Sequence, residues 1–332
     1  MRIKKLKVEI IAFLEANGLQ FLQAKAVANN IIAAEMAGKK THGIARLFLI
    51  KDWINQGKIS TKCVKPVIKI IGNSSMQVNG KNISGYYVLD LALKKAITKM
   101  ANKDIMLVSL KNTGPSVGYF GEYARLAANS GMIFLGFSNT DGGLAPFGSL
   151  NPIWGHNPIA IGLPYKKKPI AFDFGCGTIS WGDVYLKSKA NENLIDCQIA
   201  FNKKGILTNK PKEIIAGGGI FPFGGAKGSS LAFFIEIFAG IFSNSRAGKQ
   251  VKGGWGTTFI LINPYLFVQK KEFNSKLKTF LKELKNCEGE ANKKIFYPGE
   301  RSSNLYKKSI KNKTINIDLK IYKELFKENA HS

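Results

Sequence analysis

The sequence predicts an α/β protein, and three of its features favour this class. Apolar runs of strand length alternate with stretches of helical periodicity between about residues 67 and 264, as expected for strands and helices packed in layers. The 332 residues, 45% of them hydrophobic, suffice for one large domain or for two to three smaller ones. No GxGxxG motif follows a strand and no Gly-Lys-Ser/Thr closes a phosphate loop, so an ordinary Rossmann domain is disfavoured.

Each predicted element rests on its local pattern. Residues 1 to about 60 have helical periodicity in three stretches, which end at Gly57. Two short β-rich runs with an Asn-Gly turn follow over residues 67–80, and beyond residue 270 the chain is mostly helical, except at 296–304. Between them we predict helices over 86–102, 118–131 and 231–242, and strands over 105–110, 132–139, 169–175 and 257–264.

The charge and the cysteines limit the possible partners. The formal net charge of +27 would suit an acidic partner, but the lysines are spread along the chain, so we expect no nucleic-acid binding. The four cysteines lie far apart, so we expect neither a metal site nor a disulfide framework. Glu9 and Glu15 interrupt the basic N-terminal run, and the longest apolar segment contains Glu236 and is too short to span a bilayer. We therefore expect a soluble cytoplasmic protein that does not bind membranes.

Two stretches offer candidate sites. In KTHGIARLFLIKDWINQGKI, residues 40–59, His42 and Arg46 would share one face of a helix. Arg46 suits a carboxylate, and His42 suits proton exchange with a hydroxyl or carbonyl oxygen; a polar cap on a packing helix is the alternative. In GGAKGSS, the glycines, the start of a helix and Lys227 suit a phosphate, although the same turn could only seat a hydrophobic helix.

Six motifs follow one another along the chain: THGIARL, SNTDGGLAPFGS, GHNPIAIGLP, FDFGCGTISWGDV, FPFGGAKGSSLAFFIEIFAG and YPGE. In this order they resemble the malate/L-lactate/ureidoglycolate dehydrogenase family, which includes L-sulfolactate dehydrogenases, from about residue 5 to about residue 320. The resemblance implies a mixed-sheet fold of the L-sulfolactate dehydrogenase-like type, not a Rossmann fold, and a homodimer. It implies a helical segment with the His/Arg motif over 1–70, an NAD(P)-binding domain over 71–265, and a mostly helical segment over 266–332 that packs with the N-terminal helices.

The resemblance also implies roles for individual residues. His42 is the expected catalytic acid/base within Thr41-His42-Gly43, and Arg46 is the expected substrate-binding arginine. The residues expected to bind NAD or NADP are Thr140, Asp173, Phe174, Gly175, Ala226, Lys227, Pro298, Gly299 and Glu300.

This sequence departs from the family pattern at three places. A second histidine, common in a motif like Asn-Ser-x-His-Phe-Gly, is absent, and residues 114–116 read Gly-Pro-Ser. Conversely, the usual Gly-Thr-Asn-Pro turn contains His156, and Asp183 stands where a lysine is usual. We predict that Asn112 and His156 bind substrate together with Arg46.

These departures leave three interpretations open. In the first, His42 alone transfers the proton; in the second, His156 takes over part of the lost role; in the third, the protein binds cofactor without catalysis. The predicted function is NAD(P)-dependent hydride transfer between nicotinamide and C2 of a small 2-hydroxy or 2-oxo carboxylic acid, whose anion is the expected partner. The alternatives are an NAD(P)H-dependent cyclic imino acid reductase and a catalytically impaired cofactor- or polyanion-binding relative.

Overall fold

The computed structural model describes residues 1–166, 168–289 and 293–326. Its N-terminal part is a layer of helices: α1 (Ile3–Ala16), α2 (Phe21–Met36) and α3 (Arg46–Asn55). Leu6, Ile10 and Leu14 recur every four residues on α1 and are fully buried, as the helical periodicity predicts.

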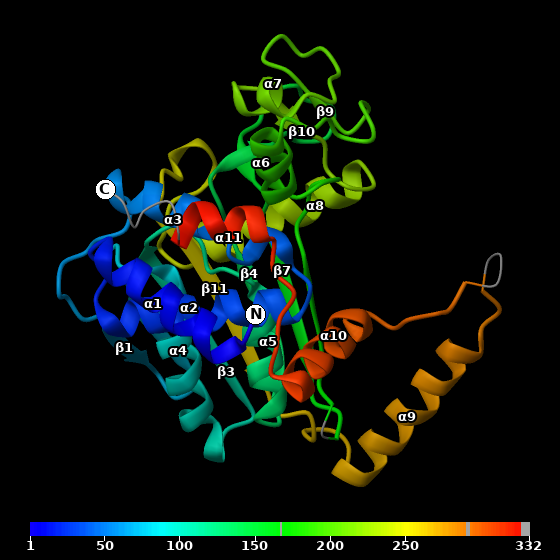
Figure 1. Cartoon of the computed structure of the whole chain (residues 1–332). Coiled ribbons are helices and arrows are strands. Elements are labelled where there is room, and N and C mark those ends of the chain that lie inside the picture. Colours follow the sequence, from blue (N-terminus) through cyan, green and yellow to red (C-terminus); the bar gives the residue numbers. More distant parts are fainter. Residues whose placement is uncertain (167, 290–292, 327–332) are drawn as a thin grey trace.

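The C-terminal part of the chain returns to this layer (Figure 1). Tyr322 and Leu325 of α11 (Leu319–Phe326) belong to the same hydrophobic core as the N-terminal helices. Helix α10 (Glu300–Asn312) packs against α2 and against a strand of the main sheet. Segments from both ends of the chain therefore build one layer.

A seven-stranded mixed sheet lies at the centre, in the order β1-β2-β3-β11-β4-β7-β8. Its strands are β1 (Val67–Ile71), β2 (Ser75–Asn79), β3 (Ile105–Thr113), β4 (Ile133–Ser138), β7 (Ile159–Leu163), β8 (Ile170–Phe174) and β11 (Trp255–Ile262). Only β2 and β3 pair in parallel; the other neighbours are antiparallel. The predicted mixed-sheet, non-Rossmann architecture is confirmed. The sequence did not predict β7, because glycines and prolines on both sides of it are typical of a loop.

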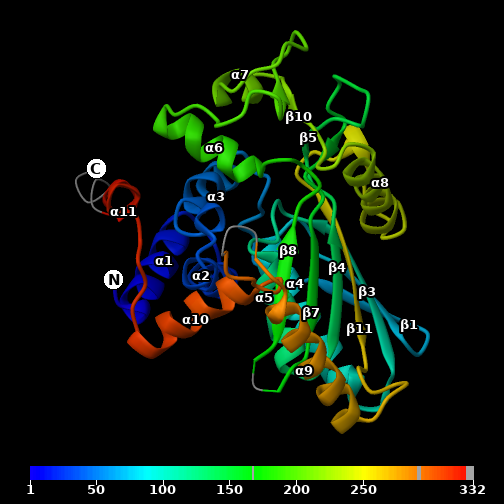
Figure 2. The ribbon, with the colours of Figure 1, turned by 90° about the vertical axis from the view of Figure 1, so that its right-hand side faces the viewer.

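Helices α4 (Gly85–Lys99) and α5 (Phe120–Asn129) cover one face of this sheet (Figure 2). Phe134 lies at the centre of the interface: its ring packs edge-on against Phe120 and stacks on Phe259 at a centroid distance of 5.4 Å. A Cβ on Gly162 of β7 would lie 2.2 Å from the carbonyl oxygen of Ala124. Glycine at this position therefore lets α5 lie directly on the sheet.

The opposite face is only partly covered. Helix α8 (Ala226–Ile235) continues into the π-helical segment η3 (Glu236–Ile241), and Phe137 of the sheet packs edge-on against Phe234 and Phe238 there. Farther along the sheet, one register row of half-buried apolar side chains runs across five strands: Leu107, Ile260, Leu135, Ile161 and Phe172. Within this row, Leu135 packs against the cluster that contains Ala232, Ile235 and Ala239 of α8 and η3.

A second, four-stranded sheet has the order β6-β5-β10-β9. It consists of β5 (Gly142–Leu144), β6 (Trp154–Gly155), β9 (Ala200–Phe201) and β10 (Gly219–Ile220), with helices α6 (Trp181–Ala190) and α7 (Pro211–Ile215) beside it. The sequence did not predict this sheet, because strands of two or three residues are too short to show alternation. The remaining short helices are η1 (Lys40–His42), η2 (Met100–Asn102) and η4 (Gly248–Gln250).

Helix α9 (Lys270–Asn286) stands out from the body of the molecule (Figure 1). Its lysine-rich sequence gives the helix that the tail pattern predicts, and α10 begins at Glu300, inside the predicted exception at 296–304. Within the described residues, no helix combines the length and the apolar character needed to cross a membrane.

Candidate active site

His42 and Arg46 do not lie on one helix, so the predicted shared helical face is wrong. His42 ends η1, and α3 begins only at Arg46. Gly43, between them, has φ −80° and ψ −151°, which is extended backbone rather than helix. The residues four apart are therefore joined by a turn.

The buried carboxylate of Glu35, on α2, fixes this turn. It accepts hydrogen bonds from the backbone N–H of Ile44 at 2.9 Å and from Lys40 Nζ at 2.6 Å. A Cβ on Gly43 would lie 2.0 Å from Glu35 Oε1, so only glycine leaves room for the carboxylate. This contact explains why the His-Gly pair occurs at this place, and the sequence did not indicate Glu35.

The His42 ring is held at one nitrogen and available at the other. Thr41 Oγ1 lies 3.0 Å from Nδ1, so Nε2 remains for a ligand. Burial lowers the pKa of His42 well below its usual value of 6.5, and the charges of Arg46, Lys39 and His156 lower it further. The imidazole is therefore neutral at pH 7 and can accept a proton.

Arg46 is a half-buried cation without a carboxylate partner among the described residues. Its Nε is buried and forms no hydrogen bond there. Burial lowers the pKa of Arg46, and the groups that oppose this are the hydroxyls of Tyr86 and Tyr185. The guanidinium carbon lies 5.9 Å from the centre of the Trp53 ring. Because an unpaired buried charge is unfavourable, this arrangement suits an anionic ligand.

His156 lies in a second turn, which the backbone holds tightly. Its N–H donates to Thr140 Oγ1 at 2.8 Å, its carbonyl accepts from the N–H of Cys176 at 2.7 Å, and Asn157 Oδ1 accepts from the N–H of Thr140. Both ring nitrogens are buried, without a hydrogen-bond partner in the described part of the chain. Burial lowers the pKa of His156 to about 4.

The predicted cofactor residues 173–175 lie between these two histidine turns. Lys39, three residues before His42, has its Nζ 3.8 Å from Asp173 Oδ1. Burial raises the pKa of the Asp173 carboxyl. The charge of Lys39 and the backbone N–H groups at the start of α5 lower it in part. Phe174 is 42% exposed, and a Cβ on Gly175 would lie 3.0 Å from the carbonyl oxygen of His156. The strand end thus contacts both turns.

Ala226 and Lys227 begin α8 and are exposed. The two residues before them, Gly224 and Gly225, have positive φ values of 55° and 60°. The preceding Phe223 ring lies 6.0 Å from that of Phe174. The predicted phosphate turn is therefore adjacent to the end of β8.

Pro298, Gly299 and Glu300 lie at the start of α10, on the other side of β8. A Cβ on Gly299, where φ is +81°, would lie 2.1 Å from the carbonyl oxygen of Ala171. Glu300 is buried and forms an ion pair with Lys285, so its carboxylate is already engaged.

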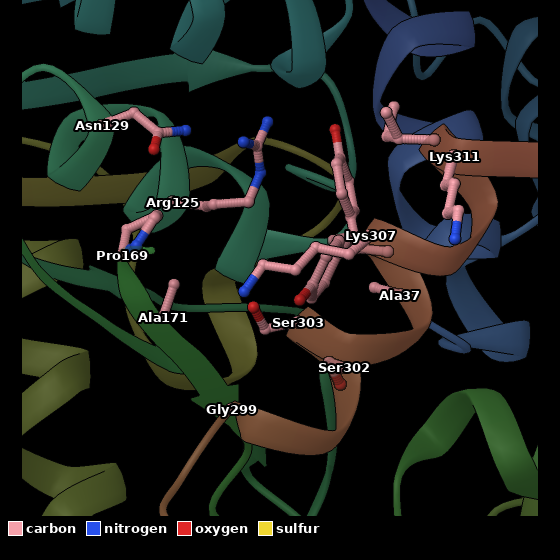
Figure 3. Close-up of a pocket in the computed structure, with 13 residues that line it drawn as sticks. Ala37, Arg125, Asn129, Pro169, Ala171, Gly299, Ser302, Ser303, Lys307 and Lys311 are labelled. Carbon is pink, nitrogen blue, oxygen red and sulfur yellow. The ribbon is translucent and has the colours of Figure 1, made fainter. Parts of the chain in front are cut away.

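A cavity of about 390 Å³ opens beside Gly299, between α5, β8 and α10 (Figure 3). Lys307 extends into it, and Arg125, also in its lining, forms a bidentate ion pair with Glu122. Neither His42 nor Arg46 lines this cavity, so it is separate from the histidine turns. Within the described residues, no group of three or more His, Cys, Asp or Glu could hold a metal ion.

Asn112 differs from the other predicted residues. Its side chain is exposed and donates to Asn79 Oδ1 at 3.3 Å, and no described contact joins it to either histidine. In the segment that lacks the second histidine, the Oγ of buried Ser116 lies 3.4 Å from the hydroxyl of Tyr86. The Tyr86 hydroxyl in turn raises the pKa of Arg46. The sequence did not indicate Tyr86, because a tyrosine within a helical pattern is more often a core residue.

Comparison with known proteins agrees with this geometry. The family model described as malate/L-lactate dehydrogenase matches residues 1–326. The chain is 32% identical over 324 residues to the malate/(S)-sulfolactate dehydrogenase of Methanothermus fervidus, which covers 95% of this chain and 93% of the relative. It is 28% identical over 217 residues to a Δ(1)-pyrroline-2-carboxylate/Δ(1)-piperideine-2-carboxylate reductase of Pseudomonas syringae pv. tomato, covering 65% and 62% of the two chains. The crystal structure of malate dehydrogenase from Entamoeba histolytica matches with a TM-score of 0.89 at 25% identity, covering 98% and 95%.

The mixed sheet and the family match define a dehydrogenase outside the Rossmann class, one that uses NAD or NADP. The chain belongs to the malate/L-lactate dehydrogenase family, as its motifs predict.

Proposed function

We propose that the protein interconverts a small 2-hydroxy carboxylic acid and the matching 2-oxo acid. The observation that carries this proposal is the half-buried Arg46, whose buried Nε has no hydrogen-bond partner and whose charge has no carboxylate partner among the described residues; it lies beside a neutral His42. A substrate carboxylate would supply the missing counter-ion through two parallel hydrogen bonds. The relatives named malate and sulfolactate dehydrogenases support this substrate class.

The proton chemistry follows from the state of His42. When bound, nicotinamide supplies or accepts the hydride at substrate C2. During oxidation, Nε2 of the neutral imidazole accepts the proton from the C2 hydroxyl; during reduction, the protonated ring returns it to the C2 oxygen. Thr41 holds the ring in place, and Arg46 fixes the carboxylate, so that C2 and its oxygen are oriented.

The residues around β8 fit a dinucleotide. A Cβ on Gly224 would meet only the side chain of Lys227, so the backbone of this turn is open to close approach. The start of α8 offers Lys227 to a phosphate, and the surface nearby includes exposed Phe174. We propose that Thr140, Asp173 and Ala226 complete this surface. Pro298, Gly299 and Glu300 would border it from α10.

An imino acid is the alternative substrate. The reductase from Pseudomonas syringae is named for cyclic imino acids, and the same Arg46 could hold their carboxylate while hydride reaches the carbon of the C=N bond. A role in binding polyanions rests only on the net charge of +27.

We also propose that the protein is a homodimer. The half-buried row lies on the same face of the sheet as α8 and η3, whose exposed apolar side chains, together with that of the next residue, are Phe233, Phe234, Ile237, Ile241 and Phe242. A cluster of exposed large apolar side chains is typical of an interaction surface. Sedimentation velocity of the wild type and of Ile241→Glu tests this: a monomeric wild type would contradict it.

The division of the chain at residues 70/71 and 265/266 and the cytoplasmic location stay predictions.

The substrate class is tested by oxidation of NADH and of NADPH with a panel of 2-oxo acids and cyclic imino acids. We expect turnover with a 2-oxo acid. Turnover only with imino acids would replace the proposal by its alternative, and no turnover with either class would reject both.

A further inference from the structure

The ring of His156 occupies space that glycines leave open. A Cβ on Gly177 would lie 2.2 Å from its Cε1, and a Cβ on Gly175 would lie 3.3 Å from its Nδ1. The imidazole therefore packs against the loop that follows β8. Together with the backbone hydrogen bonds to Thr140 and Cys176, this contact fixes where the ring lies.

Both ring nitrogens of His156 are buried, and neither forms a hydrogen bond in the described part of the chain. The backbone of Ile179 lies close to the ring and favours its protonated form, but this contact falls short of a hydrogen bond. Buried polar groups in native proteins are nearly always paired, so two unpaired nitrogens on one ring point to a ligand.

The surroundings connect this ring to the reaction centre. Asp183 lies at the start of α6, and its Oδ2 accepts a hydrogen bond from Ser180 at 2.5 Å. A Cβ on the preceding Gly182 would lie 2.8 Å from Cβ of Thr41, beside His42. The negative charge of Asp183 raises the pKa of His156, and the charge of a protonated His156 lowers that of His42. Because burial keeps the imidazole neutral at pH 7, one nitrogen can donate a hydrogen bond while the other accepts one.

We propose that His156 is a second substrate-contacting histidine, which hydrogen-bonds an oxygen at the reacting end of the substrate while His42 exchanges the proton. This inference rests on the proposed function and assigns a role to a residue that departs from the family motif. It favours the interpretation in which His156 takes over part of the role of the missing histidine.

Two substitutions at His156 separate shape from hydrogen bonding. His156→Phe keeps a flat ring without nitrogens, and His156→Gln restores a donor and an acceptor. We expect the Phe variant to lose about 10²-fold in kcat/KM, the typical effect of removing one such donor, and the Gln variant to regain at least about tenfold of this. The Kd for NADH, from fluorescence titration, should stay unchanged. Wild-type kcat/KM in the Phe variant would overturn the inference, and so would a parallel loss of NADH affinity, because the ring would then contact the cofactor.

A change outside the histidine gives an independent test. Gly177→Ala should displace the ring and reproduce the loss seen in the Phe variant, with His156 itself intact. Gly254→Ala is the matched control, because a Cβ there has nothing within 4 Å and the variant should behave as wild type. Thermal unfolding of both variants checks that they fold. If folded Gly177→Ala retains full activity, the position of the ring does not matter and the inference fails.

A binding measurement keeps the inference testable if no acid is turned over. Oxamate, an unreactive 2-oxo acid analogue, is titrated into the protein–NADH complex and followed by NADH fluorescence. We expect wild type to bind oxamate at least about tenfold more tightly than His156→Phe, the effect of roughly one hydrogen bond of 1.4 kcal/mol. Equal affinities would overturn the role of His156 whether or not the proposed reaction is correct.

Discussion

The two histidine turns differ in which parts of the chain hold them. The His42 turn is held from nearby in sequence, by Glu35 and Lys40, while the His156 turn is held by Thr140 and by the loop at Cys176. The first turn can therefore be recognised from a short motif. The second acquires its environment only when distant strands of the sheet come together.

The difference also appears in how the rings are bonded. His42 has Thr41 as a partner at Nδ1, whereas neither nitrogen of His156 has one in the described chain. A residue with a built-in partner and a free nitrogen suits proton exchange. A residue with two unbonded nitrogens suits a bound ligand that can pair with them. Substitutions in the two turns test this distinction.

The largest effect should come from the first turn. His42→Ala should lower kcat by 10² to 10⁴-fold, the usual contribution of a general acid or base, with the Kd for NADH unchanged. Steady-state kinetics and fluorescence titration measure the two. An unchanged kcat would remove His42 from the proton transfer and leave His156 as the candidate.

Acid should destabilise the protein through both rings. The pKa of His42 and that of His156 lie below 6.5 in the folded protein, so below pH 6.5 the unfolded chain binds protons that the folded one does not. Stability is present in full above pH 6.5 and falls towards pH 4, by on the order of 3 kcal/mol for His156 alone. Urea unfolding at several pH values measures this. In His156→Gln the decline should be shallower, and an equal decline would show that the ring is not desolvated.

The tight contact in the first turn should tolerate no side chain. Gly43→Ala would place Cβ 2.0 Å from the Glu35 carboxylate, and relieving this overlap should cost about 1–3 kcal/mol. Both the midpoint temperature of thermal unfolding and kcat should fall. Gly254→Ala is the matched control, because a Cβ there has open space around it. Gly57→Ala does not serve as one, because φ is +66° at Gly57 and any side chain there is strained.

The smallest effects should distinguish the supports of the two turns. Glu35→Gln weakens the bond from Lys40, and Thr140→Val removes the acceptor for the N–H of His156; each should cost about 1 kcal/mol of stability. We expect Glu35→Gln to change the pH profile of kcat through His42. Thr140→Val should instead raise the KM of the acid through His156. Identical kinetic changes in both variants would mean that the turns are not independent.

Much of the architecture could be predicted from patterns within single elements. Leu6, Ile10 and Leu14 indicated a buried helix face, and the strands at 105–110 and 257–264 were evident from their apolar runs. Strand β7 and the small sheet could not be predicted, because their strands are short or enclosed by turn residues. The shared helical face of His42 and Arg46 was wrong, because a carboxylate eight residues before Gly43 decides the local conformation.

By itself, the sequence determined the family, the mixed α/β class and the residue types of the site, since these depend on motif order and on local periodicity. Only the tertiary structure decided, within the described residues, that the buried Nε of Arg46 has no partner and that both buried ring nitrogens of His156 lack a hydrogen bond. The physical reason is that desolvation and hydrogen-bond pairing depend on every segment that packs around a group. Most of those segments are remote in the chain.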